Sequence, residues 1–488
     1  MPARITSKSN SSSSGSSADD KIAGDLRRII DIKSAPLVPV IIETRVEDYI
    51  PAHIKRYLRD VLKPSKLRIL SRLTALTKRL LAITIPSYLV DPLSRDEYVK
   101  RIYIDHKRGI PELSSLENTM LNIRLERLGT IRDDVRSILR AKQQMMTIFA
   151  KRRDEAAATT VLSSDITSTG EVIEGLGVTQ LHKANFLGQN IKLAIIDTGA
   201  TPLVFNLHAQ SGAKVVPIQY INATTTTVNA DTNGHGTHVF TIAAGQRVEV
   251  VDRGSSSSIQ QGGGGASGVV VVGMAPLSTK IVVKALTTPM GIGSDSNVIA
   301  AISQAISQGA EVINMSLGSP ASDEEEVPKE DDALVRFIET FANTNIIFCI
   351  ASGNDGSTKH ISSPAIAENA IAIGAYDFKT GKVAGFSNKG EGLDFIMPGV
   401  NIFSGIQPGT LLDGIRDVQP GYAVLSGTSM ATPFAAGLLA VIKQIYKAKG
   451  KDLTWVDVIK AGRERGEPWT PERGYGVLSP DLFLVEEQ

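Results

Sequence analysis

Cysteine is nearly absent from this sequence of 488 residues, which carries a single thiol at Cys349. One thiol cannot form a disulfide within the chain, so a disulfide-stabilised fold is excluded, and the composition suits a reducing compartment. Cys349 lies in the apolar run 346–350, where a thiol usually behaves as a small buried hydrophobic group. We therefore expect a structural role for this thiol and no reactivity.

Long hydrophobic runs are missing as well. No stretch approaches the roughly 20 apolar residues that a membrane-spanning helix needs. The N-terminus has no apolar segment of the kind found in secretory signals, because residues 11–17 are mostly serine. These absences predict no membrane span and no standard export signal. An intracellular location is the default expectation, and secretion by another route or association with a virion stays open.

Neither sign of charge is in excess, since the formal net charge is +1. The chain as a whole therefore gives no electrostatic argument for binding nucleic acid. What the sequence does contain is 42% hydrophobic and 21% charged residues, which is typical of globular proteins. The length is sufficient for two or three domains with a substantial core.

The first part of the chain divides into a tail and a small domain. Residues 1–35 are rich in serine and predict a flexible tail. Residues 36–108 predict a small α+β sandwich in the order β-α-β-α-β. Its expected elements are strands at 37–44, 81–86 and 99–106, a helix at 46–62, and a second helix that begins with Ser94 as its cap.

A charged connector follows at 109–175. Residues 113–151 have a helical, highly charged pattern, and residues 152–175 are small and polar, as in an exposed linker that proteases cut. We interpret the charged part as an amphipathic connector packed on a neighbour. An alternative is that its basic segment, 120–153, binds nucleic acid or another acidic partner.

From residue 176 to 488 apolar strands alternate with helices. The expected strands are 192–196, 215–220, 269–272, 280–286, 311–315, 346–351 and 370–375, and the expected helices include 296–308 and 332–343. Nearly continuous apolar strands predict a parallel sheet that is covered by helices on both faces. Two insertions of low complexity, 246–268 and 322–332, predict exposed loops.

Three segments of this domain place a reactive side chain among glycines, in the order Asp197, His235 and Ser429. Asp197 ends an apolar strand, which is where open α/β sheets place ligand chemistry. His235 precedes a helical segment, and Ser429 precedes the apolar segment 434–446, with Pro433 near the expected first turn. Each signal alone also has a structural explanation, such as a helix cap for Ser429. Together they supply a nucleophile, a base and an orienting carboxylate.

These segments resemble the subtilisin-like serine proteases, the subtilase family. The matching motifs are 195–199, 235–239, 312–318, 351–354 and 427–433, and the similarity extends over residues 177–480. The resemblance implies a serine endopeptidase that cleaves through an acyl-enzyme. Ser429 would attack the peptide carbonyl, His235 would transfer the proton, and Asp197 would orient the imidazole. His238, the second histidine of its motif, would be structural.

The resemblance also implies an oxyanion hole and a substrate cleft. Asn354 would donate from its side-chain amide, and the Ser429 N–H would be the second donor. Substrate would bind as an extended strand between two segments of the cleft, Gly291-Ile292-Gly293 and Ser316-Leu317-Gly318. The first specificity pocket would include Ala351, Ser352, Gly353 and the segment 362–364. Asp355 is near in sequence but does not clearly stand at the base of that pocket, so we expect a broad or apolar preference.

By the same resemblance, the 36–108 domain corresponds to a propeptide that assists folding, blocks the cleft and is removed by self-cleavage at 152–175. No cofactor is required for the chemistry. A structural calcium ion is in doubt, because the loop that often binds it is replaced by the Ser/Gly-rich insertion 246–268. Phe240 and Thr241 replace the usual small residues after the histidine motif. The alternative function is a catalytically silent scaffold or virion component with the same fold.

Overall fold

The computed structural model describes residues 21–23, 26, 37–61, 74–110, 164–201, 218–224, 230–250, 269–287, 291–321, 323, 328–410, 412, 413, 415, 418 and 421–484. Two compact units share these residues. The first unit comprises Met1–Asp105 with Glu330–Ala333, and the second comprises His106–Lys329 with Leu334–Gln488. The expected helical connector at 113–151, with the basic segment 120–153, lies outside the described residues.

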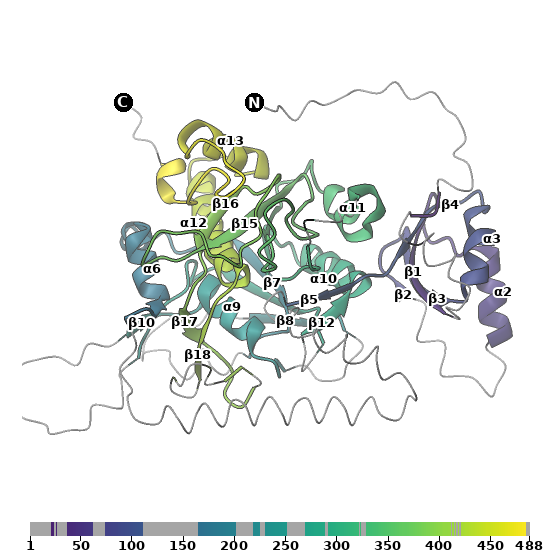
Figure 1. Cartoon of the computed structure of the whole chain (residues 1–488), viewed down its shortest axis with the longest axis horizontal. Coiled ribbons are helices and arrows are strands. Elements are labelled where there is room, and N and C mark those ends of the chain that lie inside the picture. The colour runs from purple at the N-terminus through teal and green to yellow at the C-terminus, as the bar shows by residue number, and fades with distance from the viewer. Residues whose placement is uncertain are drawn as a thin grey trace, which may run out of the picture. The chain divides into compact units, whose positions relative to one another are not determined.

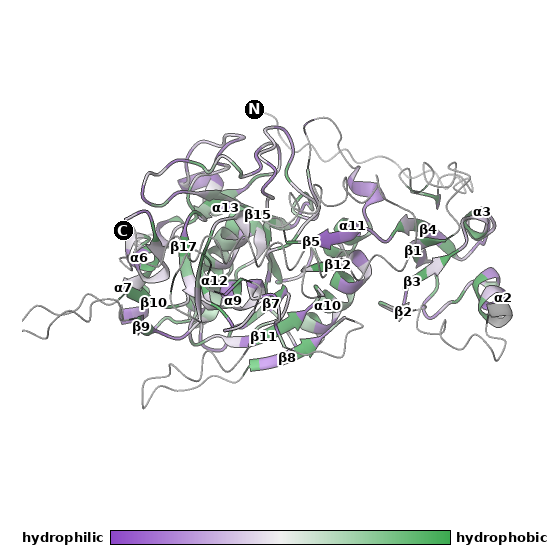
Figure 2. Ribbon diagram, turned by 60° about the horizontal axis from the view of Figure 1, so that its bottom comes forward, coloured by the Kyte–Doolittle hydropathy of each residue, from purple (hydrophilic) through white to green (hydrophobic). Residues whose placement is uncertain are grey.

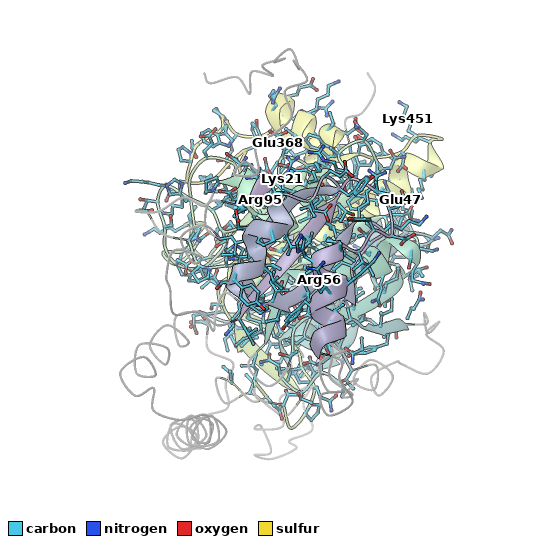
Figure 3. All side chains as sticks on the ribbon, turned by 90° about the vertical axis from the view of Figure 1, so that its right-hand side faces the viewer. Lys21, Glu47, Arg56, Arg95, Glu368 and Lys451 are labelled. Carbon is cyan, nitrogen blue, oxygen red and sulfur yellow. The ribbon has the colours of Figure 1, made fainter. Side chains whose placement is uncertain are left out.

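The first unit is built on a four-stranded antiparallel sheet in the order β2-β3-β1-β4. Its elements are β1 (Val38–Thr44), α2 (Ala52–Val61), β2 (Thr74–Ala75), β3 (Leu80–Ile85), η3 (Ser87–Leu89), α3 (Val90–Ser94) and β4 (Val99–Ile104). Figures 1 and 3 show α2 and α3 side by side on one face of this sheet, with Arg56 on α2 and Arg95 just after α3. The β-α-β-α-β order is thus present, with the short β2 added.

Two expectations for this unit were wrong in detail. The serine-rich tail is not flexible throughout, because Ile22 forms a parallel bridge with Ile102 and Lys21 Nζ donates to the Asp96 carbonyl at 2.8 Å. Ser94 does not begin a helix but ends α3, where its hydroxyl donates back to the Asp91 carbonyl at 2.7 Å. A serine makes such a local bond at either end of a helix, so its residue type alone did not fix the direction.

The second unit is built on a seven-stranded sheet in the order β16-β15-β14-β13-β7-β11-β8, in which every pair is parallel. Its strands are β7 (Lys192–Asp197), β8 (Ile218–Asn222), β11 (Thr279–Lys284), β13 (Val312–Met315), β14 (Ile347–Ala351), β15 (Ala370–Tyr376) and β16 (Phe395–Pro398). The principal helices are α9 (His235–Ala244), α10 (Asp295–Ser307), α11 (Ala333–Glu339), α12 (Thr428–Ala448) and α13 (Trp455–Arg465). The α/β class expected from the sequence is confirmed.

Helices cover both faces of this sheet, as the side chains of β14 show. Ile347 and Cys349 join the core cluster that includes α9 and α12. Phe348 points to the other face, where its ring lies 6.0 Å from that of Phe341, next to α11. Both faces are therefore apolar, and Figure 2 shows hydrophobic colour concentrated in the strands and helices rather than in the loops. Cys349 is fully buried, and burial raises the pKa of its thiol, in agreement with a structural role.

The strand order reverses at β7. From β7 the chain first forms the edge strand β8 and then β11, which lies between β8 and β7, and it later builds the other side with β13, β14, β15 and β16. In open parallel sheets such a switch point leaves a crevice at the carboxyl ends of the strands. Asp197 is the last residue of β7, so the sheet places its carboxylate at this crevice.

Smaller elements complete the second unit. They are β5 (Lys107–Gly109), β6 (Thr167–Ser168), α6 (Thr169–Gly175), α7 (Val178–Lys183), β9 (Val248–Val250), β10 (Val269–Val271), β12 (Ile292–Ser294), η4 (Lys329–Asp331), β17 (Ile402–Gly405), β18 (Tyr422–Leu425) and η5 (Pro480–Leu482). The expected strand 269–272 is not part of the parallel sheet, because β10 pairs antiparallel with β9. These two strands flank residues 251–268, which lie outside the described residues, as do residues 322 and 324–327 of the insertion 322–332.

The boundary expected at 175/176 also differs from the structure. β6 pairs with β17, and α6 carries a capping box in which Ser168 and Glu171 bond each other's backbone N–H. Residues 164–175 therefore belong to the folded second unit and not to a linker. At the other boundary, β5 belongs to the second unit rather than to the small domain. In the part of the chain that the structure describes, no helix has the length and apolar character to cross a membrane.

Candidate active site

Asp197 and His235 form a buried pair at the switch point. The His235 Nδ1 lies 2.8 Å and 3.0 Å from the two carboxylate oxygens of Asp197. Both side chains are almost completely inaccessible to solvent. Burial raises the pKa of Asp197, and the neighbouring His235 opposes that rise. The carboxylate thereby fixes the Nδ1–H tautomer and leaves Nε2 as the atom of the ring that can accept a proton.

The turn before α9 is held by Asp231, a residue that the sequence analysis did not single out. Its Oδ1 accepts from the Thr198 hydroxyl at 3.0 Å and from the Gly234 N–H at 2.8 Å. Its Oδ2 accepts from the N–H and the hydroxyl of Thr237 at 2.9 and 2.6 Å. The carboxylate therefore ties the end of β7 to the first turn of α9, and it fixes where His235 stands relative to Asp197.

Gly236 permits the close approach of these two elements. A Cβ added at Gly236 would lie 2.0 Å from the Gly199 carbonyl oxygen and 3.0 Å from Asp197 Oδ1. Behind them, the buried Lys284 at the end of β11 donates to the Thr198 carbonyl at 2.9 Å. Burial lowers the pKa of Lys284, and Asp231 and Asp197 act in the opposite direction. The site thus balances its two buried carboxylates with a buried ammonium group.

His238 lies one turn further along α9 and bonds to backbone carbonyls instead of to a carboxylate. Its Nε2 lies 3.2 Å from the carbonyl oxygens of both Ile402 and Ala423. Burial, followed by the proximity of His235, lowers the pKa of His238 to about 3. A histidine that is neutral and bonded to backbone in this way acts as a structural group. The helix also accommodates the bulkier Phe240, which is fully buried in the core.

Ser429 is the second residue of α12, a helix with Gly427 as its N-cap. Pro433 lies four residues after Ser429, in the second turn rather than the first, so it has no N–H to give to the Ser429 carbonyl. The hydroxyl of Ser316 donates to that carbonyl instead, at 2.9 Å. The Ser429 hydroxyl in turn lies 3.4 Å from the Ser316 carbonyl oxygen. Because Pro433 lacks an N–H, the Ser429 carbonyl accepts from Ser316, and this bond joins the start of α12 to the segment after β13.

Asn354 presents a side-chain donor beside the start of α12. Its Oδ1 accepts from both the N–H and the hydroxyl of Thr428, each at 2.8 Å. These bonds orient the amide so that Nδ2 points elsewhere, and Nδ2 is buried with no hydrogen-bond partner. An unsatisfied buried donor beside the start of α12 could stabilise negative charge that develops on an oxygen at this place.

The two cleft segments expected from the sequence flank a third strand. β5 pairs antiparallel with β12, so that Gly109 lies opposite Ile292 and Arg108 opposite Gly293. Gly109 also exchanges two backbone hydrogen bonds with Gly318, at 3.0 and 3.1 Å. The chain's own residues 107–109 therefore occupy the place where we expected an extended substrate (Figure 1).

The expected pocket residues lie between β14 and α12. The Ser352 hydroxyl donates to the Asn388 carbonyl, and the Gly353 N–H donates to the Thr428 hydroxyl. The Asp355 carboxylate accepts from the Ala321 N–H at 2.9 Å and from the Asn388 amide at 3.0 Å. Asp355 therefore fastens the segment at Ala321 to the segment at Asn388.

The chain is similar in sequence to proteins of one known family. Residues 188–462, more than half of the chain, match the model of the subtilase family, Peptidase_S8. A subtilisin from Bacillus pumilus is 34% identical over 266 residues, which cover 54% of this chain and 80% of that protein. Subtilisin E from Bacillus subtilis (strain 168) is also 34% identical, and the match covers 58% of its length. A mutant of the protease domain of PatA superposes with a TM-score of 0.46 at 23% identity, over 60% of this chain and 94% of that one.

Proposed function

The chain belongs to the subtilase family and is a subtilisin-like serine endopeptidase, and from this premise we propose that it is made as a latent, self-processing enzyme. Its substrates are polypeptides. The single observation that carries latency is β5, which holds residues 107–109 in the cleft by main-chain pairing on both sides. A peptide that enters the same cleft has to displace this strand first.

We assign the catalytic roles on the geometry of the site. Ser429 attacks the carbonyl of the substrate, and its proton passes to His235 Nε2. The imidazolium that forms is stabilised by the Asp197 carboxylate at Nδ1. His235 then returns the proton to the leaving amine, and water hydrolyses the acyl-enzyme in a second round of the same steps.

Asn354 Nδ2 and the N-terminus of α12 stabilise the tetrahedral oxyanion. The unpartnered amide hydrogens supply one donor, and the Ser429 backbone N–H in the first turn of α12 supplies the other. The partial positive charge of the helix N-terminus acts in the same direction. Because these groups are already in place, little reorganisation is needed when charge develops on the oxygen.

Self-processing has to separate β5 from the rest of the enzyme, so the cut lies between Ile110 and residue 164, where the described part of the chain resumes. This narrows the linker of 152–175 that we predicted, because residues 164–175 are folded. The cleavage site that we propose therefore lies within 111–163. Calcium binding at the insertion 246–268, which the sequence left in doubt, is not tested, since residues 251–268 lie outside the described residues.

The test compares full-length wild type with Ser429→Ala, which removes the nucleophile and little else. We expect freshly purified wild type to digest casein only after a lag, during which intact mass and N-terminal sequencing show a shortened chain. Ser429→Ala should stay full length and inactive. Wild type that digests casein at full rate before any cut would contradict latency. Wild type that is neither cut nor active would support the silent scaffold that we considered as the alternative.

A further inference from the structure

Arg108, the central residue of β5, is buried although it is the largest charged side chain of the strand. Its side chain is 1% exposed, and Nε forms a close ion pair with the carboxylate of Asp295, which is 0% exposed. The guanidinium also donates from Nη1 to the Ser363 carbonyl at 3.4 Å. A charged side chain is seldom buried unless a site has been built to receive it.

Asp295 belongs to the rigid framework of the cleft. It is the first residue of α10, immediately after Ser294, whose side chain forms a capping box with Asn297. The Asp295 N–H donates to the His106 carbonyl at 2.9 Å. The helix N-terminus favours a carboxylate at this position. The negative charge therefore belongs to the second unit itself and remains there when β5 leaves.

The pairing register gives the position of Arg108 in a substrate. Gly109 pairs with Gly318, and two residues before Gly318 comes Ser316, whose carbonyl oxygen lies 3.4 Å from the Ser429 hydroxyl. In an antiparallel register, a substrate residue two places after the one opposite Gly318 therefore lies beside the nucleophile. The residue in the place of Arg108 is then the fourth before the bond that is cleaved.

The neighbours of Arg108 on the strand are held differently. A Cβ on Gly109 would have only the Gly291 carbonyl oxygen, at 3.8 Å, within contact distance. Ile110 is 1% exposed, and its side chain fills the space beside Gly291, where Thr198 also lies. In a substrate with this register, the residue in the place of Ile110 would be recognised by apolar contact, and the residue in the place of Arg108 would be recognised by its charge. The side chain in the place of Gly109 would make almost no contact with the enzyme.

We propose that Asp295 is a specificity-determining residue that selects arginine at the fourth position before the cleaved bond. This deepens the proposed function and rests on it, since it assumes that substrates follow the path of β5. A substrate without a cation there takes the guanidinium charge away from a buried carboxylate, which is strongly unfavourable. Lysine is a weaker substitute, because the planar guanidinium reaches Asp295 and Ser363 at once and an ammonium group does not.

The first test uses the self-processed enzyme and peptides that differ only at the fourth position. We expect kcat/KM to fall at least tenfold from arginine to alanine, and lysine to lie between them. In Asp295→Asn the ratio for arginine over alanine should fall to within about twofold of unity. Asp457→Asn, an aspartate in the first turn of α13, is the matched control and should keep the wild-type ratio. An arginine preference that survives in Asp295→Asn would overturn the proposal.

A second measurement does not depend on turnover. In the full-length Ser429→Ala chain, hydrogen exchange of residues 106–110 reports how firmly β5 is held. Adding Asp295→Asn should speed this exchange at least tenfold, and adding Asp457→Asn should leave it unchanged. If Asp295→Asn leaves the exchange unchanged, the proposed role of Asp295 is wrong, even if the enzyme is active. Faster exchange with Asp295→Asn, combined with a wild-type chain (Ser429 intact) that never processes itself, would support the role of Asp295 and contradict the proposed function.

Discussion

Two buried carboxylates at the cleft, Asp197 and Asp295, are alike in burial and differ in the side chain that pairs with each of them. Asp197 pairs with His235, and both belong to the framework around the parallel sheet. Asp295 pairs with Arg108, which belongs to a strand that self-processing removes in our proposal. The first pair is therefore permanent and the second is exchangeable. A permanent pair sets the reactivity of the site, whereas an exchangeable pair sets which peptides reach it.

The permanent pair gives the largest expected effect. Asp197→Asn should lower kcat by roughly 10,000-fold with little change in KM, because an amide no longer fixes the Nδ1–H tautomer of His235. Steady-state kinetics on a fourth-position arginine peptide measures this change. The ratio for arginine over alanine should stay as in wild type, since Asp197 does not contact that position. A loss of the ratio together with kcat would show that the two carboxylates are not independent.

Asn354 supplies the next largest effect. Asn354→Ala should reduce kcat by about 100- to 1,000-fold, the scale on which one oxyanion donor acts in a subtilisin. KM should change little, because Nδ2 has no partner until the oxyanion forms. Asn354→Asp is the informative companion, since it keeps an acceptor for Thr428 but removes the amide donor, and it should be at least as impaired. A variant that raises KM with normal kcat would place Asn354 in substrate binding instead.

The variant Arg108→Met tests the exchangeable pair of Arg108 and Asp295 by changing the arginine. It keeps a long side chain and removes the charge. The buried Asp295 then loses the guanidinium that it faces while β5 is in place, so the strand should leave the cleft more readily. We expect the lag before casein digestion to shorten about tenfold. Gly109→Ala should change the lag by less than about twofold, because an added Cβ meets only one atom, at 3.8 Å. Equal lags for the two variants would remove Arg108 from any role in latency.

The sequence allowed one of these pairs to be predicted and not the other. Asp197 and His235 stand in segments whose glycines and apolar runs are visible in order along the chain, so strand ends and helix starts could be inferred. Asp295 lies among residues typical of any helix start, and Arg108 lies beside another basic residue. They are 187 positions apart, and only the folded cleft brings them together. The broad or apolar preference that we expected concerned the first specificity pocket. It gave no information about the site at Asp295.

Other parts of the fold divide in the same way. Strands buried on both faces were predictable from their apolar runs, but β10 resembles them in sequence and pairs in a hairpin instead. Pro433 was expected in the first turn of a helix because that is where proline is least costly. Its actual position exposes the Ser429 carbonyl to Ser316, a contact that joins α12 to the segment after β13. Local sequence propensity predicts that a strand or helix forms, whereas the segment that it pairs with or contacts depends on the tertiary structure.

His238 supplies a third case, a buried titratable group with no carboxylate to pair with. Its pKa is about 3 in the folded protein, against an ordinary value of 6.5. As the pH falls below about 6.5, the unfolded chain takes up a proton on this histidine and the folded chain does not. The free energy of unfolding should therefore fall by about 1.4 kcal/mol per pH unit between about pH 6.5 and 3 from this group alone.

Urea unfolding of the Ser429→Ala chain across this pH range measures the loss without self-digestion. His238→Gln keeps an amide donor for the Ile402 and Ala423 carbonyls but cannot titrate, so its stability should depend less steeply on pH in the same window. At neutral pH the glutamine variant should be the less stable of the two, because its fit in a packed site is poorer. An identical slope for both chains would mean that His238 is not held neutral. Burial away from any carboxylate would then not distinguish the titration of His238 from that of His235, whose Nδ1 is bonded to Asp197.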